Sequence, residues 1–184
     1  VGRDTGEAES RARRSEEGLQ RSLETQRLIA AVAEAAASAP DEQTLLGAAT
    51  LLIREALASD NCGFLLLDGA LGVLRHARSF HSRRGEGELQ PIPVGRGIVG
   101  RVARDGVASR IDDTRLDPDY LAFDPLMRSE LCVPLKVGER VLGVFDAESA
   151  RPAAFSEADL ALLSILTSHV AGAVERLRAT AALR

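Results

Sequence analysis

Three carboxylates stand inside two segments that otherwise have the composition of β-strands. Glu130 lies in SELCVPLKV, residues 129–137, and Asp146 and Glu148 lie in RVLGVFDAE, residues 140–148. Charged side chains are uncommon within strands, because burying an unpaired charge costs free energy. They can take part in a ligand site. The alternative is that they are solvated at a strand end or pair with an arginine, namely Arg78, Arg110 or Arg128.

The turn between these two strands decides which face of a sheet the acids occupy. Side chains alternate between the faces, so Glu130 shares a face with Cys132, and Asp146 shares one with Glu148. A three-residue turn places Asp146 opposite Cys132, whereas a two-residue turn places it opposite Leu131 on the other face. The sequence leaves both arrangements open.

The glycine-rich stretch VGRGIVGRVARDG, residues 94–106, has the letters of a dinucleotide-binding loop. That loop needs a strand before it and a long helix after it, within a βαβ unit. Here two prolines interrupt the preceding segment, and an Asp-Gly pair ends the helix after about seven residues. A Gly-Lys-Ser/Thr phosphate loop is also missing from the stretch. The glycines therefore indicate a tight entry into a short helix.

The thiols and imidazoles suggest neither a disulfide framework nor a metal site. Cys62 lies in an apolar strand and is interpreted as a buried, inert thiol. Cys132 either packs in the core or faces a pocket, where it would be sensitive to oxidation. The three histidines are His76, His81 and His169, and their spacing is not that of metal ligands, so we expect no metal site. We also expect no catalytic residues.

The composition is that of a globular domain in a reducing cytoplasm. The 184 residues are 45% hydrophobic and 27% charged, with only 3% aromatic residues and a net charge of -4. Few aromatics and a negative charge argue against nucleic-acid binding. No apolar run approaches the roughly 20 residues of a membrane span, and no signal peptide is evident. Because the chain lacks a starting Met, we interpret it as a piece of a longer protein.

Apolar periodicity predicts helices at both ends and strands between them. Helices are expected over 8–38, 42–58, 97–104 and 156–181, and strands over 62–67, 71–80, 89–94, 108–111, 129–137 and 140–148. Hairpin-linked strands of this kind predict an antiparallel sheet in an α+β domain. Asp41 and Ser156 are expected to cap the helices that follow them. Residues 81–88 are a polar loop, and residues 112–128 form a long loop of the kind that covers sites.

The terminal helices carry narrow apolar seams that suit a partner helix. We therefore predict a homodimer through both helices. Its interface residues would be Leu19, Leu23, Leu163, Val170, Val174 and Leu177.

These motifs together resemble a GAF domain. They are the glycine turn, the paired Asp112-Asp113, the S-E-L-x-V-P-L and G-V-x-D-x-E-S strands, and the F-S-x-x-D helix start. The resemblance implies a PAS-related fold with a central antiparallel sheet. The N- and C-terminal helices would cover one face and a lid-covered pocket the other. It divides the chain into an N-terminal helical segment over 1–39, the GAF domain over 40–178 and a C-terminal helix extension over 179–184.

One enzymatic relative within the resemblance is free methionine sulfoxide reductase. It uses acids at the positions of Glu130, Asp146 and Glu148 to hold the amino group of its ligand. Its reactive cysteines are not matched, since Val99 and Phe123 stand at two of their positions. Thiolate chemistry requires a thiol, so we expect that the chain is not an enzyme.

The expected ligand pocket draws on alternate strand positions and on the lid, which holds Tyr120, Phe123 and Met127. The candidates are Phe64, Leu66, His76, Arg78, Ile98, Tyr120, Phe123, Met127, Glu130, Cys132 and Asp146.

The resemblance implies a regulatory sensor in a bacterial signalling protein such as a histidine kinase, a diguanylate cyclase or a transcription regulator. A small ligand would act through the dimeric helices on an output domain elsewhere. The alternatives are a free methionine sulfoxide reductase-like enzyme and a ligand-free dimerisation module. No cofactor, nucleic acid or membrane partner is indicated.

Overall fold

Six strands form one antiparallel sheet in the order β3-β2-β1-β6-β5-β4. The strands are β1 (Asn61–Asp68), β2 (Val73–His76), β3 (Ile92–Pro93), β4 (Ser109–Ile111), β5 (Ser129–Val137) and β6 (Arg140–Ser149). The computed structural model describes residues 3–85 and 89–183. Residues 1–2, 86–88 and 184 fall in the expected N-terminal segment, polar loop and C-terminal extension, and they lie outside the described residues.

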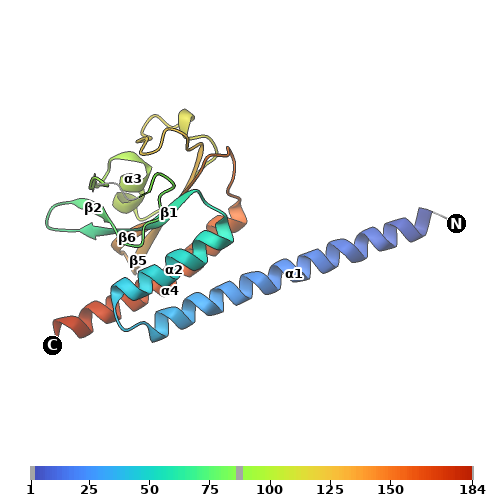
Figure 1. Cartoon of the computed structure of the whole chain (residues 1–184), viewed down its shortest axis with the longest axis horizontal. Coiled ribbons are helices and arrows are strands. Elements are labelled where there is room, and N and C mark those ends of the chain that lie inside the picture. The colour runs from blue at the N-terminus through green and yellow to red at the C-terminus, as the bar shows by residue number, and fades with distance from the viewer. Residues whose placement is uncertain (1–2, 86–88, 184) are drawn as a thin grey trace.

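Helices cover both faces of this sheet, but unequally (Figure 1). The long helices are α1 (Arg3–Ser38), α2 (Glu42–Leu57) and α4 (Glu157–Ala182), and all three lie on one face. The short helix α3 (Gly97–Asp105) lies on the other face, beside the loop over 112–128, which we call the lid. The lid begins with a single 3-10 turn, Thr114–Leu116. The expected α+β architecture is confirmed.

Local capping sets where α2 and α4 begin, as the sequence predicts. The Asp41 side chain accepts a hydrogen bond from the Thr44 backbone N–H at 2.7 Å. Ser156 and Asp159 form a reciprocal capping box, in which each side chain bonds the other residue's backbone N–H. These bonds satisfy N–H groups that the first helical turn leaves unpaired.

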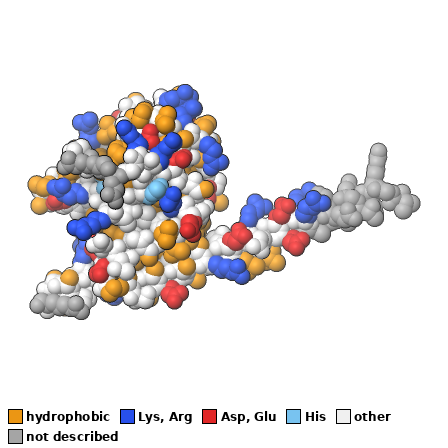
Figure 2. Space-filling view, viewed as in Figure 1, with side chains coloured by type: hydrophobic (Ala, Val, Ile, Leu, Met, Phe, Trp, Pro, Cys, Tyr) orange, Lys and Arg blue, Asp and Glu red, His pale blue; other side chains and the backbone are white. Residues whose placement is uncertain are grey.

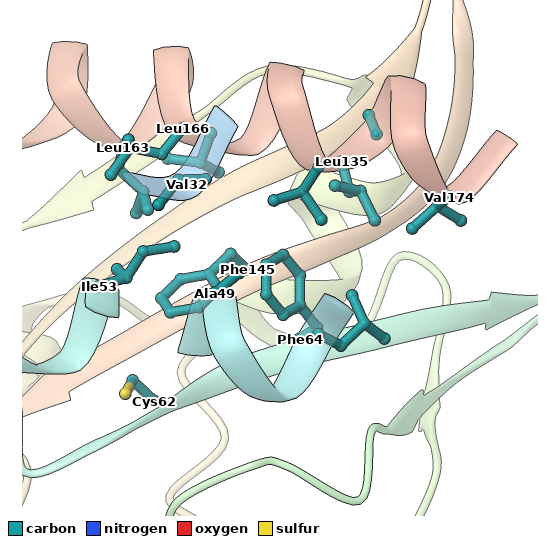
Figure 3. Close-up of a cluster of buried hydrophobic side chains, with 14 of the residues drawn as sticks. Val32, Ala49, Ile53, Cys62, Phe64, Leu135, Phe145, Leu163, Leu166 and Val174 are labelled. Carbon is teal, nitrogen blue, oxygen red and sulfur yellow. The ribbon is translucent and has the colours of Figure 1, made fainter. Parts of the chain in front are cut away.

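The main core lies between the sheet and the long helices (Figure 3). Phe64 and Phe145 meet edge to face at its centre, with ring centroids 4.8 Å apart. Leu163, Val170 and Val174 of α4 are fully buried in this core. They have no surface to present to a second copy, so these three residues are not available for the predicted dimer interface. Leu177, by contrast, is only half-buried.

The two halves of α1 have different surroundings. Val32 and Ala36 near its end are buried, and Arg176 of α4 donates to the Ala36 carbonyl at 2.6 Å. Leu19 and Leu23 are 63% and 41% exposed. This half projects away from the domain, with charged side chains of both signs along it (Figure 2).

The strands at the β2 end of the sheet are shorter than the sequence suggests. The strand expected over 71–80 pairs only at Val73–His76, and the one expected over 89–94 only at Ile92–Pro93. Pro91 and Pro93 lack the N–H that a continued ladder needs, which limits β3 to an edge. The chain after β2 instead folds back, so that a single bridge joins Cys62 and His81.

Among the described residues, α4 alone is long and apolar enough to cross a membrane by length and composition. Its apolar side chains pack on the sheet and on α1 and α2, and several of them are fully buried. The helix therefore serves as a core helix of this domain.

Candidate ligand site beneath the lid

The three carboxylates of β5 and β6 lie together on the α3 face of the sheet. In the register of the two strands, Glu130 stands opposite Glu148 and Cys132 opposite Asp146. Residues directly opposite each other point to the same face. Cys132 packs with the small apolar cluster beneath α3, so all four side chains belong to that face.

A β-bulge near the turn brings the acids to this face. The turn itself has two residues, because Val137 pairs with Arg140. With an unbroken ladder, that turn would place Asp146 opposite Leu131 on the face of the long helices. The register shifts between Leu135 and Lys136, and Leu142 is the residue without a partner. The extra residue turns Asp146 back to the α3 face.

The acids are almost completely buried. Glu130, Asp146 and Glu148 are 3%, 5% and 4% exposed. Glu148 accepts hydrogen bonds from the Asn61 amide at 2.8 Å and from the Tyr120 hydroxyl at 3.4 Å. Glu130 and Asp146 lie close enough for one carboxyl group, when protonated, to donate a hydrogen bond to the other. Within the described residues, Glu130 Oε1 and Asp146 Oδ1 have no hydrogen-bond partner.

Burial raises the pKa of all three carboxyl groups, and repulsion within the group adds to the shift at Glu130 and Asp146. Loss of water is the largest cause for each, and the charge of Asp146 adds to the shift at Glu130, as that of Glu148 does at Asp146. A hydrogen bond between the two groups would raise the pKa of Glu130 and lower that of Asp146. The site therefore holds protons that an incoming cation can displace.

The arginines considered as partners of these acids are engaged elsewhere or lie outside the site. Arg110 pairs with Asp112 and with Glu157, and Arg128 pairs with Asp113 at 2.9 Å. Arg78 is exposed and does not line the pocket. The alternative in which arginines neutralise the three acids is therefore not the arrangement found.

A cavity of about 40 Å³ lies between the acids, α3, β2 and the lid. That space admits water-sized groups, but an amino acid needs more. Leu121 and Phe123 close the cavity from the lid, and both are more than one-third exposed. A ligand would therefore enter by displacing these two side chains.

The glycine turn forms the α3 wall of this cavity. Gly97 has a φ of +68°, in the left-handed region that suits glycine. At Gly100, a Cβ would lie 2.5 Å from the Pro93 carbonyl oxygen. Gly97 thus allows the predicted tight entry into α3, and Gly100 lets the helix pack against the β3 edge.

Ion pairs join the two ends of the lid to each other and hold its middle against α3. Asp113 accepts from Arg115 and Arg128, and these guanidinium groups hold the pKa of Asp113 well below its usual range. Further along, Arg101 of α3 binds Asp117 at 2.8 Å and Asp119 at 2.9 Å. The Asp113 side chain also caps the 3-10 turn, by accepting from the Arg115 backbone N–H.

The structure brings together about half of the predicted ligand-binding residues. Those that line the cavity are His76, Ile98, Tyr120, Phe123, Glu130 and Asp146.

The other predicted residues lie elsewhere. Phe64 and Leu66 point into the main core, because β1 presents its other face to α3. Met127 is buried but does not line the cavity, and Cys132 lies beneath α3. The prediction that Arg78 and these four residues line the cavity is therefore wrong.

Sequence reasoning missed several lining residues. They are Leu65, Phe80, Ile92, Arg96, Gly97, Val99, Leu121 and Glu148. Alternation from Asp146 would have given Glu148. The correct face of β1 would have given Leu65 in place of its two neighbours.

Neither thiol is exposed. Cys62 faces the main core, and burial raises the pKa of its thiol to about 11. Cys132 is fully buried, and burial together with the charges of Asp146 and Glu130 raises its pKa well above the usual range. Across residues 3–85 and 89–183, no cluster of three His, Cys, Asp or Glu side chains is placed to hold a metal ion.

The family model described as "GAF domain" matches residues 39–175. Two curated relatives align with a stretch of 68 residues, 37% of this chain. Protein YtsP of Bacillus subtilis is 35% identical there, and free methionine-R-sulfoxide reductase of Escherichia coli is 34% identical. The stretch covers 42% and 41% of those proteins, so the match spans less than half of their length.

Among solved structures, free methionine-R-sulfoxide reductase from Neisseria meningitidis, in complex with its substrate, superposes with a TM-score of 0.78. The sequences are 28% identical, and the match covers 85% of this chain and 91% of that one. The expectation that the chain is not an enzyme is contradicted by these relatives, because two of the three proteins described are named as reductases.

Proposed function

The chain belongs to the GAF domain family, and on that premise we propose that it binds free methionine-R-sulfoxide, or a closely related free amino acid, beneath its lid. The ammonium group would lie against Glu130, Asp146 and Glu148. Leu65, Ile98 and Phe123 would surround the side chain.

The observation that carries this proposal is the set of buried carboxylate oxygens without partners. Glu130 Oε1 and Asp146 Oδ1 have no hydrogen-bond partner among the described residues. Buried polar groups normally have a partner, so such oxygens mark a place where one is expected. A protonated amine supplies three N–H donors and the opposite charge. The choice of methionine-R-sulfoxide as the ligand comes from the similar reductases, and the one from Neisseria meningitidis was solved in complex with its substrate.

A pair of ligands tests the role of the ammonium group. We expect calorimetric titration of the protein to give at least a roughly ten-fold lower Kd for L-methionine-R-sulfoxide than for 4-(methylsulfinyl)butanoate, which lacks the amine. Both compounds carry the sulfoxide and a carboxylate. Equal affinities, or no binding of the amino acid, would contradict the proposal.

Reduction of the bound sulfoxide is a second candidate function, favoured by the position of Cys132 opposite Asp146. The Cys132 sulfur would attack the sulfoxide sulfur, giving methionine and a cysteine sulfenic acid. One molecule of an external thiol would then give a mixed disulfide and water. A second would regenerate Cys132 and release the external disulfide. Because α3 covers Cys132, this chemistry needs α3 to move.

The two thiols allow a matched test of reduction. With dithiothreitol as the external thiol, we expect chromatography to detect methionine from the parent protein and from Cys62→Ser, but not from Cys132→Ser. Loss of activity in both variants, or in neither, would rule out Cys132 as the reactive thiol. If the parent protein forms no methionine, the reduction proposal fails and the binding proposal remains.

We further propose that the exposed stripe of α1 pairs with a second copy of the chain and relays ligand binding to other domains. Leu19 and Leu23 support this, because exposed leucines at helical spacing suit a partner helix. We expect the double variant Leu19→Glu and Leu23→Glu to halve the mass measured by light scattering. Leu71→Glu, at an equally exposed leucine in the β1–β2 turn, should leave the dimer intact. A monomeric parent protein would refute the proposal.

A further inference from the structure

We propose that His76 is a specificity-determining residue, which hydrogen-bonds an uncharged oxygen on the ligand whose ammonium group the three acids hold. This inference rests on the proposed function and narrows its ligand class. The site would select amino compounds that carry an oxygen on the side chain over those with a thioether or an alkyl chain.

The register of the sheet places His76 on the pocket face. His76 ends β2 and stands directly opposite Leu65 of β1. Leu65 belongs to the apolar cluster beneath α3 and lines the cavity, so the imidazole points to the same side. His76 itself also lines the cavity.

Two aromatic rings fix the orientation of the imidazole. Phe80 meets it edge to face with ring centroids 4.6 Å apart, and Phe123 of the lid lies at 6.3 Å. Phe123 is therefore both a wall of the cavity and a neighbour of His76. Displacement of the lid by a ligand would open the space beside the imidazole.

The Nδ1 atom of His76 is buried and has no hydrogen-bond partner among the described residues. It shares this condition with two acid oxygens of the same pocket, Glu130 Oε1 and Asp146 Oδ1. Burial lowers the pKa of His76 to about 4, so the ring is neutral at pH 7. A neutral imidazole has one donor and one acceptor nitrogen, and it suits an uncharged polar group.

The distance across the sheet fits a ligand of amino-acid size. β1 separates β2 from β6, so the strand of His76 lies roughly 10 Å from that of Asp146. The side chains of His76 and Asp146 line the same cavity, as does Leu65 of the strand between theirs. An ammonium group at one end and an oxygen several bonds away would engage both sides.

The test compares two ligands that differ by one oxygen, L-methionine-R-sulfoxide and L-methionine. We expect the protein to bind the sulfoxide about ten-fold more tightly. His76→Phe keeps a ring against Phe80 and should reduce this preference to less than about three-fold, with the affinity for methionine unchanged. His76→Asn places an amide near the position of Nδ1 and should restore part of the preference. His81→Phe, a matched change outside the cavity, should have no effect.

The nitrogen-15 chemical shifts of the histidines give a second readout that does not depend on a variant. Addition of the sulfoxide should move the Nδ1 resonance of His76, whereas methionine should not. An equal affinity for the two ligands, or a preference that persists in His76→Phe, would overturn the role of His76 and leave the proposed function standing. Failure of both ligands to bind would overturn both proposals.

Discussion

We expect the Asp146→Asn variant to bind L-methionine-R-sulfoxide roughly 10–100-fold more weakly than the parent protein, because it loses a charge-assisted hydrogen bond to the ammonium group. Asp146 is the strongest candidate among the acids, since it lies beside Glu130 and its charge acts on that neighbour. Asparagine keeps the shape of the side chain and removes only its charge. Calorimetric titration at pH 7.5 measures the change.

The same variant should be more stable than the parent protein. The pKa of Asp146 is raised well above the ordinary value of 3.8, so folding favours its protonated form. The stability that Asp146 contributes is therefore fully present below about pH 4 and is lost as the pH rises through the raised pKa. Asparagine remains neutral throughout. We expect its Tm to equal that of the parent protein near pH 4 and to exceed it by roughly 2–6 °C at pH 8.

An exposed carboxylate supplies the control for both measurements. Glu139 lies in the β5–β6 turn and is exposed. Glu139→Gln should change neither the Kd nor the pH dependence of the Tm. A lower Tm for Asp146→Asn at pH 8 would mean that the ionised Asp146 stabilises the fold, and that the site is structural.

Replacement of Gly100 by alanine should lower the free energy of unfolding by about 1–3 kcal/mol. The added methyl group would lie 2.5 Å from the Pro93 carbonyl oxygen and 3.0 Å from the Gly95 nitrogen, both of them backbone atoms that cannot rotate away. The α3 helix would have to move off the β3 edge. We expect a Tm lower by roughly 3–10 °C, together with weaker ligand binding, because α3 is a wall of the cavity.

Gly172, in the middle of α4, is the matched control for Gly100. A Cβ at Gly172 would meet nothing within 4 Å. Gly172→Ala should raise the stability by roughly 0.5–1 kcal/mol, since alanine loses less chain entropy in a helix. Thermal unfolding of both variants separates a packing effect from a general effect of glycine. Equal Tm changes would contradict the packing argument.

Much of the fold is predictable from local sequence. The Asp41 and Ser156 caps and the turn at Gly138 define where elements begin and end. What local sequence leaves open is how far a strand stays paired. The prolines near β3 and the return of the chain to Cys62 after β2 shorten those strands, and the second of these depends on tertiary contacts.

The site is less predictable, because it depends on which face each strand presents. Local sequence does not show which face of β1 points toward α3. From the sequence we therefore expect Phe64 and Leu66 in the pocket, whereas Leu65 lines it. Similarly, the apolar seam of α4 has the same pattern whether it packs within its own domain or against a partner helix. The burial of Leu163 shows that this seam packs into the core of the domain.

The bulge at Leu142 makes the acidic site depend on how the residues between Cys132 and Asp146 are divided between paired and unpaired positions. If Leu142 paired with Leu135 while the turn stayed the same, Asp146 would stand opposite Leu131 and face the main core. If Arg140 joined the turn as the bulge was lost, or if Leu142 were deleted, Cys132 would still stand opposite Asp146 and the acids would stay where they are. A hairpin of this kind can therefore lack the bulge and keep the acidic site, provided that the unpaired residue is removed or taken into the turn.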